Sequence, residues 1–294
     1  MDIVVIFDRL VRAETTGSYC LQALERLGHR VMHYEPFVPS PGALSFDGYR
    51  RMPTDADLYL SVDDDLTYPG PVVNAPSVYW CIDVHRMDAL LGGGNRWDKM
   101  RGFDLVCSAQ RDMAEQLSVS WLPLACDPTM SHPIDTPKLF SWSFVGSMVT
   151  DKRQACIDQL RNAVPGGVVA TAYGAAMNAL YAASQLVVNV SFSNDVNMRF
   201  FEALASGTPL LSTRPRNGEE ELFDTVLWFE GERDIAAAAE GALAAPEQLH
   251  QLGLAGAEHA MARHSYTVRM SQLLELVGTT SVVPDGAATP SLLR

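Results

Sequence analysis

The stretch NMRFFEALASGTPLLST, residues 197–213, contains a complete transition from helix to strand. Its apolar residues fall on one helical face: Phe200, Phe201, Leu204 and Ala205. Gly207 suits the position just after a helix C-terminus, and Pro209 prevents the helix from continuing. The apolar run at 210–213 then predicts a short buried strand. The stretch therefore predicts a helix followed by a core strand, as in an α/β fold.

A single carboxylate, Glu202, interrupts this apolar helix, and Arg199 stands three residues before it on the same side. One interpretation is a local ion pair, worth about 0.2–0.5 kcal/mol. The other is that both side chains serve a binding site. The stretch alone leaves the two interpretations open.

The composition sets broad limits on the function. The chain has 294 residues, enough for two domains of ordinary size or one large one. Its formal charge of −13 argues against a general polyanion-binding surface, so a nucleic-acid acceptor is disfavoured. The five cysteines show no CxxC pair, which favours buried free thiols and a reduced, cytoplasmic setting. The N-terminus is too short and charged for a signal peptide, and we expect no membrane span.

The first half of the chain reads as a βαβ opening followed by more strands. A strand at 2–7, a helix at 15–30 and a strand at 30–34 imply a parallel sheet. Further strands are expected at 58–62, 77–82, 104–108 and 119–124, with helices near 96–102 and 109–117.

A Pro-rich segment at 125–138 predicts a linker, after which the α/β pattern begins again. Strands are expected at 140–146, 167–174, 185–191, 210–213 and 225–230. Helices are expected at 150–163 and 177–183, in the quoted stretch, and from 230 to about 277. We predict an α/β chain of two Rossmann-like domains facing each other across a cleft, at 1–130 and 131–276, with a loose tail at 277–294.

Two common nucleotide-binding signatures are absent from the sequence. The first strand is followed by FDRLVRAETTGSY, which has no G-x-G-x-x-G turn. The GGGN run at 92–95 lacks the Lys-Ser/Thr of a P-loop. Nicotinamide chemistry and ATP chemistry therefore have no signature here.

The second half offers groups suited to a diphosphate. Gly146 and Ser147 directly follow a strand, and Arg153 lies at the start of the next helix. A small residue lets the backbone approach a ligand, and a helix N-terminus with a guanidinium favours phosphate. The segment 193–197 precedes the helix of Arg199 and Glu202 and supplies three more candidate residues: Asn194, Asp195 and Asn197. Because ligands of open α/β sheets bind at the carboxyl ends of strands, these groups outline a nucleotide-diphosphate site.

The chain resembles the GT-B-fold glycosyltransferases, most closely the spore maturation protein CgeB-like group. The matching pieces, over roughly residues 77–276, are FDLVCSAQRD, WLPLACDP, FVGSMVTDKR, AYG, DVNMRFFEALASGTPLLST, EELF and HSYTVRM. The resemblance implies that Glu202 binds the ribose of the donor, while Arg153 and Arg199 hold its diphosphate. It also implies that the final helices cross back to brace the first domain.

Two departures from related retaining families are visible. Those families carry an acidic residue eight positions before the ribose-binding Glu, where this chain has Asn194 with Asp195 next to it. They also often carry a glycine-rich loop after the first strand. Here only Gly17, beside Thr16, remains, and we name this pair as an acceptor or loop site. Inversion or retention of the anomeric configuration stays open.

Two clusters of polar residues directly follow strands expected in the first half of the chain. Asp83 and His85 follow the strand at 77–82, and the pair is expected to act on an acceptor hydroxyl, the alternative being a surface pair. Asp63, Asp64 and Asp65 follow the strand at 58–62. They are read either as a polar turn or as the acidic metal site of a GT-A glycosyltransferase.

These observations predict a metal-independent glycosyltransferase with a nucleotide-diphosphate sugar as donor and no cofactor. The acceptor class stays open among small molecules, glycans, proteins and, less favoured, nucleic acid. Two alternatives remain: a GT-A-like metal enzyme that uses Asp63–Asp65, and a non-catalytic nucleotide-sugar-binding protein.

Overall fold

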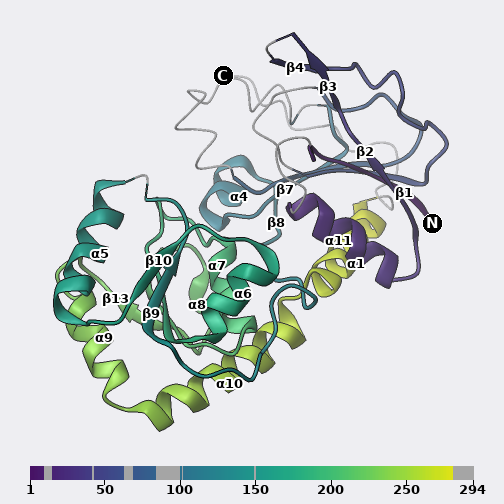
Figure 1. Ribbon diagram of the computed structural model, residues 1–294. Helices are drawn as coiled ribbons and strands as arrows, with labels where there is room; N and C mark the ends of the chain where they lie inside the picture. Colours follow the sequence, from purple (N-terminus) through teal and green to yellow (C-terminus); the bar gives the residue numbers. More distant parts are fainter. Residues whose placement is uncertain are drawn as a thin grey trace.

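The computed structural model describes residues 1–9, 15–41, 43–62, 69–83, 100, 102–148 and 150–280, which form two α/β domains (Figure 1). The expected Asp63–Asp65 cluster, His85, most of the helix expected near 96–102, and the end of the tail lie outside the described residues.

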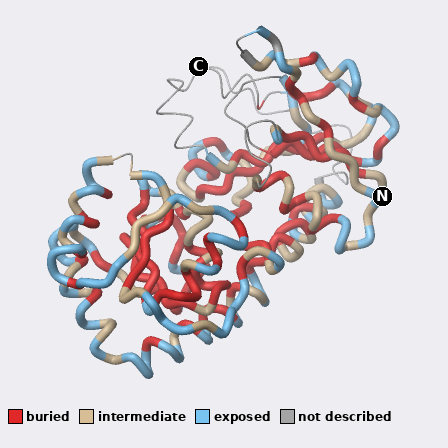
Figure 2. The backbone as a smooth tube through the Cα atoms, in the orientation of Figure 1, coloured by how far each residue is buried: buried red, intermediate tan, exposed pale blue. Residues whose placement is uncertain are grey.

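The sheet of the first domain has six parallel strands in the order β2-β1-β5-β6-β7-β8. In that order they span Arg30–Tyr34, Asp2–Ile6, Leu58–Val62, Ser77–Cys81, Leu105–Ser108 and Ser120–Trp121. Every residue of β5 and β6 is buried, as expected for central strands of a sheet with both faces covered (Figure 2). The helices α1 (Thr16–Arg26) and α4 (Arg111–Leu117) pack beside it. The strands expected in this half are all found.

One hairpin of the first domain is not predicted from the sequence. The strands β3 (Phe37–Ser40) and β4 (Ala43–Phe46) pair in antiparallel fashion, outside the main sheet. The prolines of the run EPFVPSPG read as loop residues, because proline cannot donate to a strand ladder. A two-stranded hairpin tolerates Pro39, since each strand pairs on one side only.

The sheet of the second domain has five parallel strands in the order β10-β9-β11-β12-β13. In that order they span Val168–Ala170, Phe140–Val145, Ser184–Asn189, Leu210–Thr213 and Leu227–Phe229. The strand expected at 167–174 is therefore too long, because the chain turns at Gly174 and starts a helix there. Gly174 has φ +53°, a left-handed conformation that favours glycine.

The second domain and the interdomain connection contain seven helices among the described residues. They are α5 (Asp151–Ala163), α6 (Gly174–Ala182), α7 (Met198–Ala205), α8 (Glu219–Leu222), α9 (Ile235–Leu243), α10 (Pro246–Arg263) and α11 (Tyr266–Thr280). None of the helices formed by described residues has the length and hydropathy that a membrane span needs. All five cysteines are buried and free, as the sequence predicts.

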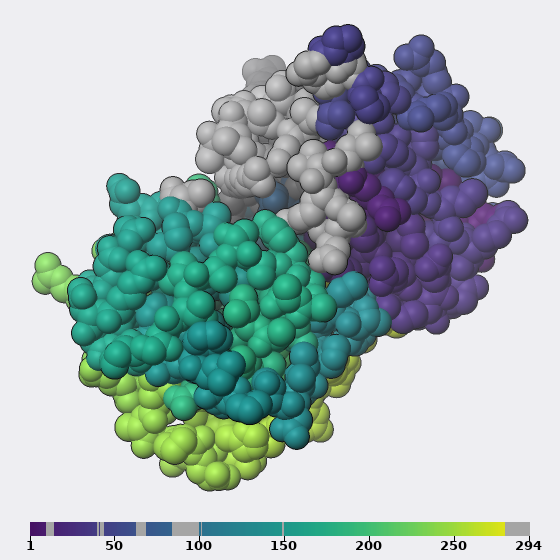
Figure 3. Space-filling model, in the orientation of Figure 1, coloured from purple at the N-terminus to yellow at the C-terminus, as the bar shows by residue number. Residues whose placement is uncertain are grey.

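The last two helices return to the first domain, as the resemblance implies. In Figure 1, α10 runs along the second domain and leads into α11, which packs against α1. The rings of Tyr19 and Tyr266 lie 5.4 Å apart, and Arg26 Nε donates to Thr267 Oγ1 at 3.2 Å. The space-filling view shows two lobes, purple for the first domain and teal to green for the second (Figure 3). The returning helix therefore braces two domains that remain distinct.

His264 is a buried polar residue between the two returning helices, α10 and α11. The carbonyl of Leu222 lies 2.9 Å from Nε2 of His264 and 2.7 Å from Nε2 of His259, so both nitrogens carry protons. Nδ1 of His264 accepts from Nη2 of Arg269, at 3.2 Å, and the same Nη2 donates to the carbonyl of Leu124. Burial, followed by the charge of Arg269, lowers the pKa of His264 to about 4.

This neutral histidine predicts a loss of stability in acid. The unfolded chain takes up a proton near pH 6.5 and the folded chain only near pH 4, so stability falls as the pH drops between these values. At about 1.36 kcal/mol per pKa unit, the expected loss from His264 is about 3 kcal/mol of unfolding free energy. Urea unfolding at pH 7.5, 5.5 and 4.5 measures it.

His264→Gln is the control, since its amide can still donate to Leu222 but does not titrate. We expect a flatter pH profile for this variant than for the wild type. Parallel profiles for the two proteins would contradict the assignment of the acid loss to His264.

Candidate active site

A cavity of about 700 Å³ lies between the two domains, with walls from both. The sheet order of the second domain explains its place. Strand β9 has β10 on one side and β11 on the other, so the chain connections leave in opposite directions at the β9–β11 boundary. Ligands of open α/β sheets bind in the crevice at such a point. Nine residues named from the sequence line the cavity: Thr16, Asp83, Gly146, Ser147, Arg153, Asp195, Asn197, Arg199 and Glu202.

Arg199 is the second residue of α7 and reaches toward the end of β9. Its Nε donates to the carbonyl of Val145 at 2.8 Å, and its Nη1 donates to Oδ1 of Asn189 at 2.5 Å. A Cβ on Gly146 would lie 2.2 Å from Nη2 of Arg199. A Cβ at 146 would force the guanidinium to shift, so this glycine lets Arg199 lie against the backbone in its present position.

Arg153, in the first turn of α5, lies beside Arg199. It is 7% exposed, and its Nε and Nη1 donate to the carbonyls of Val190 and Ser147 at 2.9 and 3.1 Å. The guanidinium carbons of Arg153 and Arg199 lie 6.0 and 4.8 Å from the centre of the Phe144 ring. Burial, and next the charge of Arg199, lower the pKa of Arg153. Two cations thus lie close together at the cavity wall.

Helix N-termini add positive potential to the same wall. The first turn of α7 is capped by Asn197, whose Oδ1 accepts from the backbone N–H of Arg199, and the first turn of α5 is capped by Thr150. A third terminus, that of α6, has no side-chain cap, and Tyr173 and Gly174 line the cavity there. Orphan backbone N–H groups at a helix start favour anions.

The loop before α7 is shaped by Asp195. Its Oδ1 accepts from the backbone N–H groups of Phe192 and Ser193, at 2.9 and 3.3 Å, which folds the loop into a tight turn. Asn194 is exposed and lies outside the cavity lining. Its carbonyl accepts from Nδ2 of Asn217 at 2.7 Å. Of the two candidates for a sugar-contacting residue, only Asp195 borders the cavity.

Glu202 lies one turn after Arg199 and lines the cavity. None of the ion pairs among the described residues joins Glu202 to Arg199, whose hydrogen bonds go to Val145 and Asn189. The local ion pair considered from the sequence is therefore absent here. Tyr181 lies nearby with a fully buried hydroxyl that has no hydrogen-bond partner in the described structure.

The first domain contributes Thr16, at the N-terminus of α1, and Asp83, which is exposed after β6. Gly17 is not part of the cavity lining. A Cβ there would lie 2.2 Å from the Phe7 ring, so this glycine permits close packing of α1 on the chain after β1. Among the described residues no group of three or more His, Cys, Asp or Glu side chains is placed to hold a metal ion.

Sequence reasoning missed several cavity residues. Gly174 carried a weak signal, because the piece AYG stands where a strand ends. Gln110 and Tyr173 lie in the matching pieces FDLVCSAQRD and AYG but were not singled out, and Tyr181 carried no signal, because it reaches the cavity through tertiary contacts that local patterns do not report.

Comparison with known proteins agrees with this architecture. Residues 153–275 match the model of a family described as glycosyl transferase-like. No curated protein matches the chain by sequence.

Solved structures match nearly the whole chain. Anabaena HepE, solved with UDP and glucose, is 11% identical with a TM-score of 0.69 over 95% of this chain and 100% of its own. Sucrose-phosphate synthase from Thermosynechococcus elongatus is 13% identical with a TM-score of 0.63 over 95% and 98%. A glycosyltransferase from Rickettsia africae is 10% identical with a TM-score of 0.64 over 96% and 99%. The chain has the GT-B fold of these structures.

Proposed function

We propose that this GT-B glycosyltransferase transfers a sugar from a nucleotide-diphosphate donor, without a metal ion or other cofactor, to an acceptor hydroxyl. The single observation that carries the donor assignment is the pair of guanidinium groups at the switch point of the second sheet. Two cations that lie over the same phenyl ring repel each other, and an anion that contacts both relieves that repulsion.

The donor is proposed to lie along the wall of the second domain. Its diphosphate contacts Arg153, Arg199 and the N-termini of α5 and α7, while Gly146 and Ser147 let the backbone come close. Glu202 accepts hydrogen bonds from the ribose hydroxyls, one helical turn further on. The UDP bound by Anabaena HepE makes a UDP-sugar the first donor to test.

Catalysis is proposed to come mainly from stabilising the leaving group. As the bond between the anomeric carbon and the phosphate oxygen breaks, negative charge grows on the diphosphate, and the arginines and helix termini of the proposed site stabilise that charge. On the opposite wall, Asp83, together with His85 two residues later in the sequence, is proposed to take the proton of the acceptor hydroxyl. Thr16 borders the same space.

The narrower family group, the cellular location and the class of acceptor are proposed mainly from the sequence. Membership of the CgeB-like group is proposed from NMRFFEALASGTPLL, and a cytoplasmic location from the five buried free thiols. The acceptor is proposed to be a small molecule, glycan or protein rather than nucleic acid, because the chain carries a formal charge of −13.

Replacing either arginine is expected to weaken nucleoside-diphosphate binding. Arg199→Ala and Arg153→Ala should each raise the Kd for UDP by about 10- to 100-fold, the range of a charged hydrogen bond of ~1.5–3 kcal/mol. Uridine affinity should change much less, because only the phosphates are contacted. Calorimetry with UDP and with uridine measures both affinities.

Arg161→Ala is the matched control, since Arg161 lies on α5 but is exposed and pairs with Asp158. It should leave both affinities unchanged. Equal losses for UDP and uridine in the two cavity variants would remove the diphosphate site from the proposal.

Removal of divalent metal is expected to leave transfer unaffected. The proposed site neutralises the diphosphate with guanidinium groups and helix termini rather than with a cation. Sugar transfer, or donor hydrolysis where no acceptor is known, is measured with EDTA and after re-addition of manganese. Loss of activity with EDTA and its recovery with manganese would favour the metal-dependent alternative at Asp63–Asp65.

A further inference from the structure

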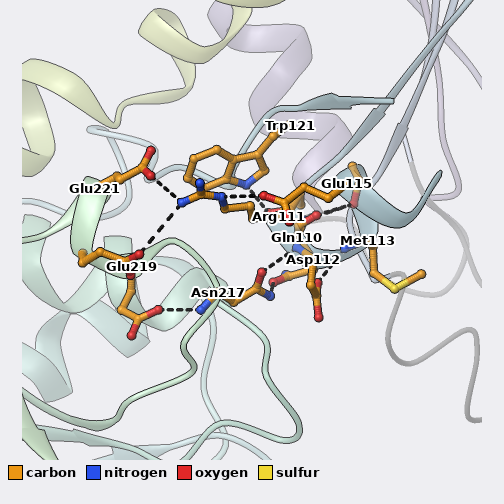
Figure 4. A network of polar contacts seen from close by, with 12 residues as sticks. Gln110, Arg111, Asp112, Met113, Glu115, Trp121, Asn217, Glu219 and Glu221 are labelled. Atoms are coloured by element: carbon orange, nitrogen blue, oxygen red, sulfur yellow. Dashed lines mark hydrogen bonds and ion pairs between the residues drawn. The ribbon is translucent and has the colours of Figure 1, made fainter. Parts of the chain in front are cut away.

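Gln110 is a buried amide of the first domain and lies among the described residues that line the cavity. This residue is 3% exposed and stands at the N-cap position of α4, yet its side chain does not cap that helix. Instead its Oε1 accepts from the backbone N–H of Val196, at 2.9 Å. It also accepts from Nδ2 of Asn217, at 3.2 Å (Figure 4). Val196 belongs to the loop that leads into α7. Gln110 thus holds the donor-side loop from the opposite domain.

Asn217, from the second domain, returns the interaction. Its Oδ1 accepts from the backbone N–H of Asp112 at 2.8 Å, which provides the cap that Gln110 leaves out. Its Nδ2 donates to Oε1 of Gln110 and also to the carbonyl of Asn194 at 2.7 Å. One helix start of the first domain and one loop of the second are therefore tied by two buried amides.

The backbone around Asn217 is fixed by a buried carboxylate. Glu219 is 1% exposed, and its two oxygens accept from the backbone N–H groups of Arg216 and Asn217 at 3.0 and 2.7 Å. Arg216 has φ +59° and Gly218 φ +85°, both left-handed. A non-glycine residue in that region is uncommon, and it persists where the surrounding structure determines it. The turn therefore holds Asn217 in the position where it contacts Gln110.

The contact between Gln110 and Asn217 is called the joint below, and the charged contacts beside it are more exposed. Arg111 pairs with Glu115 and Glu221 and lies over the Trp121 ring, with its side chain about a third exposed and those of its partners about half exposed or more (Figure 4). Exposed pairs contribute little and are screened by salt. The buried amides therefore determine how this part of the interface is aligned.

We propose that Gln110 and Asn217 are positioning residues that hold the 192–197 loop, and hence the N-terminus of α7 with Arg199, in the geometry that binds the diphosphate. Donor affinity then depends on an interdomain contact that itself makes no bond to phosphate. The inference rests on the proposed function, because it takes the diphosphate to lie at α7.

Two variants remove the joint while leaving the arginines in place. Gln110→Met keeps the side-chain length but removes the acceptor, so Val196 loses its partner. Asn217→Ala removes the link and the cap of α4. Glu221→Gln is the matched control, because it removes an exposed ion pair of the same interface and touches neither amide.

Two measurements separate positioning from direct contact and from general destabilisation. Hydrogen exchange in the 192–200 segment of the ligand-free chain should be faster in both joint variants and unchanged in the control. The Kd for UDP should rise about tenfold in each joint variant, which corresponds to about 1.4 kcal/mol, with a much smaller change for uridine. The double variant should lose less than the sum of the two, as residues of one network do.

The outcomes are distinct. Unchanged exchange in the joint variants overturns the inference, and so does faster exchange with an unchanged Kd for UDP. Both of these leave the proposed function standing. If the wild-type chain binds no nucleoside diphosphate from a panel of bases, the proposed function fails, and this inference fails with it.

Discussion

The repulsion between Arg153 and Arg199 is the constraint on which the site depends. The two guanidinium groups lie near one Phe144 ring, and burial together with the neighbouring charge lowers the pKa of Arg153. The fold offsets this cost with backbone carbonyls at the ends of β9 and β11, which accept from both side chains. The chain as a whole carries a formal charge of −13, so this pair of neighbouring cations is a local feature of the cavity wall. In the proposed function, a bound diphosphate relieves this repulsion.

This constraint links the site to the topology. The arginines belong to two strand-loop-helix units, and they meet because β9 and β11 are neighbours in the sheet. The opposite wall requires the first domain to be held nearby, and two devices do so. Helix α11 returns to pack on α1, and Arg269 of α11 donates to the carbonyl of Leu124. At the edge of the cavity, the side-chain amides of Gln110 and Asn217 join the two domains.

Much of the fold could be predicted from local patterns. The parallel strands follow from buried apolar runs, and the helix at α7 follows from the apolar face that ends at Gly207. The meeting of Arg153 and Arg199 was also predictable, because both follow strands that end on one edge. The β3–β4 hairpin was missed because its prolines read as loop, and the start of α6 because Tyr173 offers no side-chain cap.

The rest could not be predicted, because it depends on contacts that are distant in sequence. The cap that Asn217 provides for α4 spans 105 residues, and no local pattern records it. Gly17 reads as the remnant of a binding loop, and its close packing on the Phe7 ring, ten residues earlier in the sequence, has no local signal.

The most direct test of the central claim is a crystal structure of the protein with a nucleoside diphosphate bound. The account predicts that the diphosphate lies between Gly146 and the N-terminus of α7, contacting the guanidinium groups of Arg153 and Arg199, with the ribose hydroxyls at Glu202. A diphosphate bound elsewhere, with the two arginines left to their backbone carbonyls, would contradict it.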